Sequence, residues 1–359
     1  MSKQGVTSAE GLQTSDSRRT DFLQRFMRDE NLSRTEAAQL LDWLLDGATD
    51  AQIAATLIAL KRKGETVEEL AGLAEGMRAR ATRINCKHER FIDTAGTGSS
   101  SAKTFNVSTA AAFVIAGAGL PVAKHGNRAA SSKCGSADVL ADLGVNVSAD
   151  ATVSERCLNE IGICFMFAPL YHGATARVAT IRRELGVHTT FNLLGPLTNP
   201  AGAPRQIIGV WNRDLVEPMA QALALLGTER AWVVHGADGL DEITIADRTF
   251  VAEAKDGQVR SFEISPEDFG LSMSDINELR CDDAAASALI IKSVLSGERN
   301  EGARDLVIAN AAAALTVGGA ANDLLNGARL AAQSIDSGAA LTKLEELARA
   351  TNAPSATTK

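Results

Sequence analysis

Hydrophobic and polar positions follow two different patterns along this chain. From about residue 20 to residue 81, apolar residues recur every three or four positions, as at Ile53, Leu57 and Leu60, which places them on one face of a helix. Three predicted helices in this segment begin with a capping box, in which Ser or Thr is followed three residues later by Glu or Gln. The boxes are Ser33 with Glu36, Thr49 with Gln52, and Thr66 with Glu69. The segment is therefore predicted to be a small all-helical unit, and the basic end of its second helix is interpreted as a helix terminus rather than a phosphate site.

After residue 90 the pattern changes to short apolar runs that alternate with helical stretches rich in Ala and Leu. The runs predict strands at 91–92, 121–123, 164–167, 207–211 and 231–234. Alternation of strands and helices indicates a largely parallel α/β sheet. Two β-prone runs between 249 and 264 flank Asp256 and Gly257, a turn signal that predicts a hairpin. Helices are expected again from 284 to about 350.

Composition and charge exclude several classes of protein. A length of 359 residues favours two domains, and a net charge of -8 argues against a nucleic-acid or anionic-membrane binder, so any bound anion needs a local site. The five cysteines lack CxxC spacing, which suggests neither a zinc site nor a disulfide framework. The polar first twenty residues lack a signal-peptide core, and the longest uncharged run, 107–123, is too short for a confident membrane span. We therefore expect a cytoplasmic protein.

Three loops that follow predicted strands carry candidate chemistry. Segment 93–109 is a glycine-containing loop before a helix start, which suits an anion, although a simple Gly-Ser turn explains it equally well. Segment 124–136 combines three cations with hydroxyls and a glycine; it would fit a diphosphate, and a solvated basic loop is the alternative. In segment 235–244, adjacent Asp241 and Glu242 could bind magnesium or could form an ordinary acidic turn.

Six motifs stand out in these and neighbouring segments: G-T-G-x-x-x-A-K-T-F-N-V-S-T, K-H-G-N-R, S-K-C-G-S-A-D-V-L, R-R-E-L-G-V, F-N-L-L-G-P-L-T-N-P and D-G-L-D-E-I-T. In this order and spacing they resemble the anthranilate phosphoribosyltransferase family, from about residue 20 to residue 350. The resemblance implies a nucleoside phosphorylase/phosphoribosyltransferase-like α/β fold, with a small N-terminal all-helical domain packed on a larger α/β domain that has a mostly parallel central sheet. It also implies a homodimer built through the helical domains.

The expected organisation divides the chain into four parts. A mobile N-terminal tail covers 1–19, and a helical domain covers 20–88, joined by helices around 174–190. The α/β phosphoribosyltransferase domain covers 89–350, and a mobile C-terminal tail covers 351–359.

The resemblance also implies the site residues. Anthranilate is expected at Gly96, His125, Asn127, His172, Arg182 and Gly195, where Arg182 suits its carboxylate. Two magnesium ions are expected at Ser108, Asp241 and Glu242, and with Lys124 they would stabilise the departing diphosphate. No proton acceptor is assigned. Contacts with phosphoribosyl diphosphate (PRPP) are expected from Gly96, Ser99, Ser100, Thr104, Asn106, Val107, Ser108, Thr109, Lys124, His125, Gly126, Asn127, Arg128, Ala129, Ala130, Ser131, Ser132 and Ser136. In contrast, a structural role in packing, without substrate contact, is expected for His88, His188, His235, Tyr171 and the three tryptophans.

The sequence departs from the family in two places. Ser99 and Ser100 stand where the family usually has Gly-Asp, and near the expected aryl entrance Leu170 and Gly173 replace a common lysine and proline. Two alternative functions are a pyrimidine nucleoside phosphorylase-like pentosyltransferase and a non-catalytic nucleic-acid-binding family member. The K-H-G-N-R motif and the Asp-Glu pair disfavour the first, and the acidic balance with the same pair disfavours the second.

Overall fold

The computed structural model describes residues 21–98, 102, 104–128, 134–281, 283–298 and 301–353. The predicted tail at 1–19 and the end of the chain after 353 lie outside these residues. So do six of the predicted PRPP contacts: Ser99, Ser100, Ala129, Ala130, Ser131 and Ser132.

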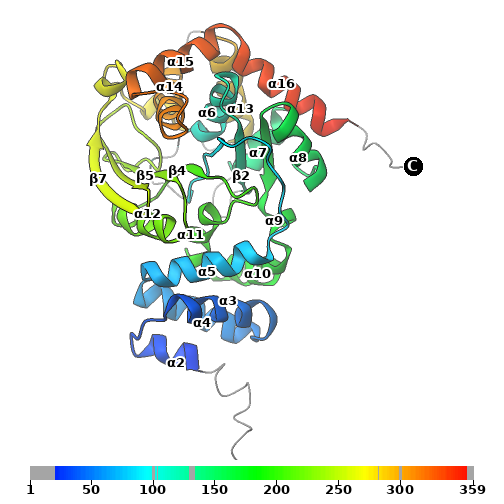
Figure 1. The fold of residues 1–359 in the computed structure, drawn as a ribbon, viewed down its shortest axis with the longest axis vertical. Helices are drawn as coiled ribbons and strands as arrows, with labels where there is room; N and C mark the ends of the chain where they lie inside the picture. Colours follow the sequence, from blue (N-terminus) through cyan, green and yellow to red (C-terminus); the bar gives the residue numbers. More distant parts are fainter. Residues whose placement is uncertain are drawn as a thin grey trace, which may run out of the picture.

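The N-terminal segment is a helical bundle, as predicted. It contains α2 (Asp21–Met27), α3 (Arg34–Asp46), α4 (Asp50–Lys63) and α5 (Val67–Arg80), and α10 (Ala176–Leu185) packs on α3 and α4 from much later in the chain (Figure 1). All three predicted capping boxes are present, with both reciprocal hydrogen bonds formed at the starts of α3, α4 and α5. These local interactions explain why the helices begin where the sequence predicts.

The basic end of α4 is a structural feature of the bundle, which confirms its interpretation as a helix terminus. The Lys63 ammonium donates to the Gly64 carbonyl at 2.8 Å, to the Glu69 carboxylate at 2.8 Å and to Asn31 at 3.0 Å. Both side chains of the Lys63–Glu69 ion pair are almost fully buried, with 4% and 1% exposure. Since Lys63 has three partners for its three protons, it has no capacity left for a phosphate.

The α/β domain is built on one seven-stranded sheet. Its strands are β1 (Ile92–Asp93), β2 (Val122–Gly126), β3 (Ile163–Phe167), β4 (Arg205–Gly209), β5 (Arg230–Gly236), β6 (Thr249–Lys255) and β7 (Gln258–Ile264). The order is β3-β2-β1-β4-β5-β6-β7; the first five strands are parallel, and β6 and β7 are antiparallel. The β6–β7 hairpin turns at Asp256 and Gly257, both with positive φ, so the predicted hairpin is confirmed.

Helices cover both faces of the sheet (Figure 1). On one face lie α6 (Val107–Gly117), α13 (Ala284–Leu295), α14 (Glu301–Val317), α15 (Leu324–Asp336) and α16 (Ala339–Asn352). On the other face, α11 (Thr190–Leu197) and α12 (Val216–Leu225) lie between the sheet and the bundle. One apolar core contains Leu57 of the bundle, Met219 of α12 and Val233 of β5 in a single cluster. The bundle is therefore packed directly on the α/β domain, as expected.

Three short helices fill the part of the domain around β3. They are α7 (Ser136–Asp142), α8 (Ala151–Glu160) and α9 (Ala168–Tyr171). Tyr171 is buried in the apolar core beside these helices. Trp43 and Trp232 are buried in other parts of the structure, which agrees with the packing role predicted for these aromatic residues.

The C-terminal helix extends further than predicted. The tail was expected to start at 351, but α16 continues to Asn352 because Thr351 is buried and bonded to the body of the domain. Its hydroxyl accepts from the Asn146 amide at 3.1 Å, and its carbonyl accepts from the Asn146 side chain at 3.2 Å. Within the described residues, no helix has the length and apolar character needed to cross a bilayer.

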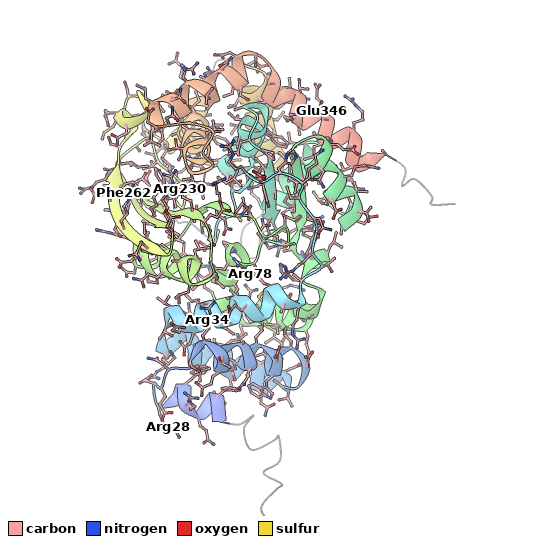
Figure 2. All side chains as sticks on the ribbon, in the orientation of Figure 1. Arg28, Arg34, Arg78, Arg230, Phe262 and Glu346 are labelled. Atoms are coloured by element: carbon pink, nitrogen blue, oxygen red, sulfur yellow. The ribbon has the colours of Figure 1, made fainter. Side chains whose placement is uncertain are left out.

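Two arginines of the bundle bond to the ends of the helices beneath the sheet. Arg78 donates from Nε to the Leu197 carbonyl at 2.7 Å and from Nη1 to the Leu226 carbonyl at 3.4 Å. Arg34 donates to the Leu225 carbonyl at 3.0 Å. Figure 2 shows both arginines where the bundle meets the α/β domain. Because carbonyls at helix C-termini are unpaired and carry partial negative charge, these guanidinium groups attach the bundle to α11 and α12.

Candidate active site

A cavity of about 570 Å³ lies at the carboxyl ends of the parallel strands. This is where open α/β sheets bind ligands, because the loops that follow the strands converge there. The walls come from the loops after β1, β2 and β5, from α11 beneath the sheet, and from single positions on α9 and near α13. The lining residues are Ala95, Gly96, Thr97, Gly98, Ala102, Thr104, Phe105, Asn106, Val107, Ser108, Lys124, His125, Gly126, Asn127, Arg128, Cys134, Gly135, Ser136, Ala168, Arg182, His188, Phe191, Asn192, Gly195, Pro196, Asp241, Glu242 and Cys281.

The loop between β1 and α6 is fixed to the end of β4. The Thr97 amide donates to the Gly209 carbonyl at 2.9 Å, and the Thr97 hydroxyl lies 3.2 Å from the same oxygen. Asn106 is the N-cap residue of α6, but its side chain bonds to Cys134 instead of the helix. Asn106 therefore does not cap α6 with its side chain. The positive end of the α6 dipole faces the cavity wall.

Gly209 is the point where two loops of the site come together. A Cβ atom at Gly209 would lie 1.6 Å from the Asp241 carbonyl oxygen, and a Cβ at Gly96 would lie 3.2 Å from the Gly209 carbonyl. Only a glycine at 209 permits this approach of the Asp241 backbone to β4. The glycine-containing loop and the acidic loop are therefore positioned by the same strand end.

Lys124 lies inside the strand β2 and points under the start of α6. The residue is 4% exposed, and its ammonium donates to the Thr94 carbonyl at 3.0 Å, to the Thr94 hydroxyl at 3.2 Å and to the Ser108 hydroxyl at 3.4 Å. Burial lowers the pKa of Lys124, and the nearby carboxylates of Asp93 and Glu242 raise it. The network holds a cation between the two acidic groups, at the edge of the cavity.

A buried carboxylate supports the Lys124–His125 segment from below. Asp93 is completely buried; it accepts from the His125 amide at 3.1 Å and from the Asn199 side chain at 2.7 Å. The Asn199 side chain also donates to the Ala123 carbonyl at 2.8 Å. Burial is the main cause that raises the pKa of Asp93 to about 6, and these donors partly offset it. Asp93 and Asn199 therefore fix β2 at the residues that reach the cavity.

Two neutral histidines lie side by side at this wall. The ring centroids of His125 and His172 are 5.2 Å apart. Burial lowers the pKa of His125 to about 3, with a smaller contribution from His172, and lowers the pKa of His172 to about 4. His125 Nδ1 lies 3.1 Å from the Gly195 carbonyl, so Nδ1 carries the proton and Nε2 is an acceptor. His125 lines the cavity, whereas His172 lies behind it and does not.

Asp241 and Glu242 form the acidic part of the cavity. A Glu242 carboxyl oxygen accepts from the Ser108 amide at 3.2 Å, so this side chain already bonds to the N-terminal turn of α6. Burial, and next the neighbouring Asp241, raise the pKa of Glu242 to about 8. The described residues contain no group of three or more His, Cys, Asp or Glu side chains arranged around a metal. Two carboxylates and a hydroxyl do suit magnesium, which completes its shell with water and substrate phosphates.

Arg182 marks the opposite, aromatic part of the cavity. Its guanidinium lies 5.5 Å from the centre of the Phe191 ring and donates from Nη2 to the Asn192 side chain at 2.9 Å. His188 lines the same wall, with its ring 4.7 Å from that of Trp211. An arginine beside aromatic rings suits a ligand that is both planar and negatively charged.

The basic loop after β2 is fixed in place by hydrogen bonds with residues that follow it closely in the sequence. Arg128 donates to Asp138 at 2.6 Å, and the Ser136 hydroxyl donates to the Asn127 carbonyl at 3.3 Å. A Cβ atom at Gly126 would lie 2.3 Å from the Ser136 hydroxyl, so the motif needs a glycine there. Arg128 is thus charge-paired with the first turn of α7, and Lys124 is the more buried of the two cations.

The structure brings most of the described candidates to one cavity. Thr109 is an exception, since it is buried in α6 away from the lining, and His172 is another. His188 is expected to be structural, and its ring does pack against Trp211; the structure also places it among the cavity-lining residues, because the turn after α10 leads directly into α11. His235 is structural as predicted, with Nδ1 2.8 Å from the Val210 carbonyl.

Several wall residues were not identified from the sequence. Phe191 and Asn192 belong to the F-N-L-L-G-P-L-T-N-P motif, and Cys134 belongs to the S-K-C-G-S motif. Both motifs stand out in the sequence, but no contact with a substrate is predicted for these three residues. Cys281 and Ala168 carry no such signal. Their positions follow from packing between distant segments, such as the bridge between Thr104 and Arg280.

Two family models match consecutive parts of the chain. The model described as the helical bundle domain of a glycosyl transferase family matches residues 20–81, and the model described as the a/b domain of that family matches residues 88–341. Fold and cavity together thus define a two-domain glycosyl transferase.

Relatives that match along nearly their whole length narrow this class. The anthranilate phosphoribosyltransferase of Anaeromyxobacter dehalogenans is 55% identical over 331 residues, which cover 92% of this chain and 98% of the relative. That of Desulforamulus reducens is 50% identical over 329 residues, which cover 91% and 95%. The chain belongs to the anthranilate phosphoribosyltransferase family.

Solved structures agree with this assignment. The anthranilate phosphoribosyltransferase of Thermus thermophilus has a TM-score of 0.87 at 37% identity, covering 93% of this chain and 100% of that one. The Saccharomyces cerevisiae enzyme in complex with PRPP and Mg has a TM-score of 0.85 at 27% identity, covering 94% and 98%. The same yeast enzyme in complex with 4-fluoroanthranilate has a TM-score of 0.83 at 25% identity, with the same coverage. The predicted bundle and mostly parallel sheet are confirmed.

Proposed function

We propose that this chain is a magnesium-dependent anthranilate phosphoribosyltransferase. It transfers the phosphoribosyl group of PRPP to the amine of anthranilate, which gives N-(5-phosphoribosyl)anthranilate and diphosphate for tryptophan biosynthesis. One observation carries the proposal: a single cavity has a buried lysine beside two carboxylates at one end and an arginine beside aromatic rings at the other.

The first end suits the sugar donor. The positive end of the α6 dipole lies at this end of the cavity, and Lys124 adds a buried positive charge beneath it. The yeast relative was solved in complex with PRPP and Mg, which supports a donor site in the same family. We assign the diphosphate to this end, with contacts from the β1–α6 loop and from the 124–136 loop.

The acidic pair is proposed to hold two magnesium ions together with the Ser108 hydroxyl. The fit rests on the donor set, since two carboxylates and a hydroxyl line one part of the cavity. Burial, and next the neighbouring Asp241, raise the pKa of Glu242, and a divalent cation offsets both effects. When bound, magnesium supplies positive charge to the oxygens of the diphosphate leaving group.

The second end suits the acceptor. Arg182 can pair with the anthranilate carboxylate, while Phe191 and His188 flank its ring. Gly195, His125 and Asn127 complete the wall between the two ends. This arrangement brings the arylamine toward the anomeric carbon, where a C–N bond forms as the C–O bond to diphosphate breaks. The amine nitrogen then gives up one proton, which the released diphosphate or water accepts. An arylamine is already neutral at pH 7, so the nucleophile needs no prior deprotonation, and orientation and charge placement are the main contributions of the protein.

A fluorescence assay tests the proposal directly. Loss of anthranilate fluorescence is expected only when PRPP and magnesium are both present, and omission of either should abolish it. The double variant Asp241→Asn with Glu242→Gln should reduce turnover sharply. Full activity without magnesium would remove the metal assignment.

The acceptor assignment has its own test. Arg182→Ala should raise the KM for anthranilate far more than the KM for PRPP, because the substrate carboxylate loses its partner. Arg183→Ala is the matched control, since Arg183 lies on the same helix with its side chain exposed. Equal losses for both substrates in Arg182→Ala would refute the assignment.

The proposal includes a cytoplasmic homodimer formed through the helical bundles. All five cysteines are free thiols, which suits a reducing compartment. Met27 on α2 and Ile58 on α4 expose apolar side chains on the bundle, which suits a contact with a second copy. Light scattering should give twice the chain mass, and a monomer at working concentration would contradict this part.

A further inference from the structure

The guanidinium of Arg182 is held by a neutral side chain. Arg182 Nη2 donates to Asn192 Oδ1 at 2.9 Å, and the same oxygen accepts from the Thr189 amide at 3.0 Å. Thr189 is the N-cap residue of α11, and the bond from its amide to Asn192 forms one half of a capping box. Asn192 therefore links the position of Arg182 to the first turn of a helix that lines the cavity.

Arg182 has no acidic partner within the described part of the chain. Its side chain is partly buried, its Nε atom is buried without a hydrogen-bond partner, and its contacts are the amide of Asn192 and the face of Phe191. Burial lowers the pKa of Arg182, and no carboxylate acts to raise it. The cavity thus contains a positive charge that the protein orients but does not neutralise.

A carboxylate at position 192 would satisfy the same local geometry. Asp accepts hydrogen bonds as Asn does, suits the first turn of a helix because of the helix dipole, and makes a charge-assisted bond with arginine that is roughly twice as strong as a neutral one. It would also cancel the charge that a substrate carboxylate needs. The neutral Asn192 amide therefore orients the Arg182 guanidinium and leaves its positive charge available to a substrate carboxylate.

We propose that Asn192 is a positioning residue that determines specificity for an acceptor bearing a carboxylate, because it orients Arg182 without pairing its charge. This inference rests on the proposed function, in which Arg182 pairs with the carboxylate of anthranilate. Asn192 acts through Arg182 and is assigned no contact with the reacting atoms.

The decisive variant is Asn192→Asp. We expect the KM for anthranilate to rise by about 30-fold or more, the order that follows from losing one desolvated charge pair, while the KM for PRPP changes by less than about threefold. The thermal midpoint should be unchanged or higher, because the helix start keeps its cap and gains an ion pair. Gln52→Glu is the matched control: it makes the same amide-to-carboxylate change in the capping box of α4, outside the cavity lining, and should leave both KM values unchanged.

A second variant separates positioning from a purely structural role. Asn192→Ala removes both the cap and the bond to Arg182 but leaves the charge of Arg182 unpaired, so it should raise the anthranilate KM by only about three- to tenfold and lower the thermal midpoint. A purely structural role predicts the opposite order for KM, with the alanine variant the more impaired and the aspartate variant close to the wild type. That order would overturn the inference.

The outcomes also separate this inference from the proposed function. If the wild-type protein fails to consume anthranilate in the presence of PRPP and magnesium, the proposed function fails. If the wild type is active and Asn192→Asp keeps its anthranilate KM, the role of Asn192 fails alone.

Discussion

The contact between Gly209 and the acidic loop leads to a prediction about a residue that touches no substrate. In Gly209→Ala, the new methyl group would lie 1.6 Å from the Asp241 carbonyl oxygen and 2.6 Å from the Asp241 carbonyl carbon. Both are backbone atoms, so a side-chain rotation cannot relieve the overlap. The backbone at Asp241, together with Glu242, has to move away from β4.

The size of that movement follows from ordinary packing distances. Real Cβ contacts are essentially never shorter than 3.0 Å, so the Asp241 carbonyl and β4 must separate by at least about 1.4 Å. A displacement of about 1 Å in a catalytic group costs on the order of 10²-fold in rate, so we expect turnover to fall by about 100-fold or more. Overpacking of this kind also lowers the free energy of unfolding by about 1–3 kcal/mol.

Steady-state kinetics as a function of magnesium concentration, with thermal unfolding of the same samples, test this prediction. Gly209→Ala should remain folded with a lower thermal midpoint, and its activity should not return at saturating magnesium. Gly302→Ala is the control: at the start of α14 a Cβ would meet nothing closer than 3.8 Å, so activity should be normal and the helix slightly more stable. Wild-type kcat in Gly209→Ala would refute the reasoning.

Three further predictions concern buried polar groups. Asn310→Leu leaves the N–H and C=O of Ile243 without partners, which should cost about 1–3 kcal/mol per group and lower turnover through the neighbouring Glu242; thermal unfolding and a magnesium titration would show both effects, and an unchanged midpoint would contradict the first. Arg78→Ala removes the bonds to the ends of α11 and α12, so the anthranilate KM should rise more than the PRPP KM, and equal changes would argue against coupling through α11. The folded-state pKa values of His125 and His172 lie below the usual 6.5, so these two rings take up protons mainly in the unfolded chain as the pH falls from 6.5 toward 4. Stability should then decrease by up to about 1.4 kcal/mol per pH unit for each histidine, and the slope of the thermal midpoint should be shallower in His172→Gln.

The parts of this fold that depend on neighbouring residues could be predicted from the sequence. Ser33, Thr49 and Thr66 cap their helices because a capping box needs only four consecutive residues. The hairpin at Asp256 and Gly257 is similarly local, since the turn fixes the pairing of the two strands that flank it. The end of α16 was placed too early because burial of Thr351 depends on Asn146, which is far away in the sequence.

The site could be predicted only in part, for the same physical reason. Lys124 lies in β2, and Asp241 and Glu242 lie in the loop after β5, so all three are near the edge where the parallel topology brings loops together, and their motifs are contiguous. Their supports are not: Asn199 reaches Asp93 across 106 residues, and Asn310 reaches Ile243 across 67. The position of His188 in the cavity wall was not predicted, because a histidine next to a helix has no local feature that separates a packed ring from a lining residue.

The hairpin at the end of the sheet has a consequence for association between copies of the chain. In the part of the chain that the structure describes, strand β7 has one hydrogen-bonded neighbour, β6, and its exposed positions include Gln258, Arg260 and Glu263. Charged side chains along an open margin oppose the addition of a foreign strand, because pairing would require their dehydration. Concentrated solutions of this protein should therefore resist growth of extended intermolecular sheets, and any pairing of chains is directed to surfaces other than this strand.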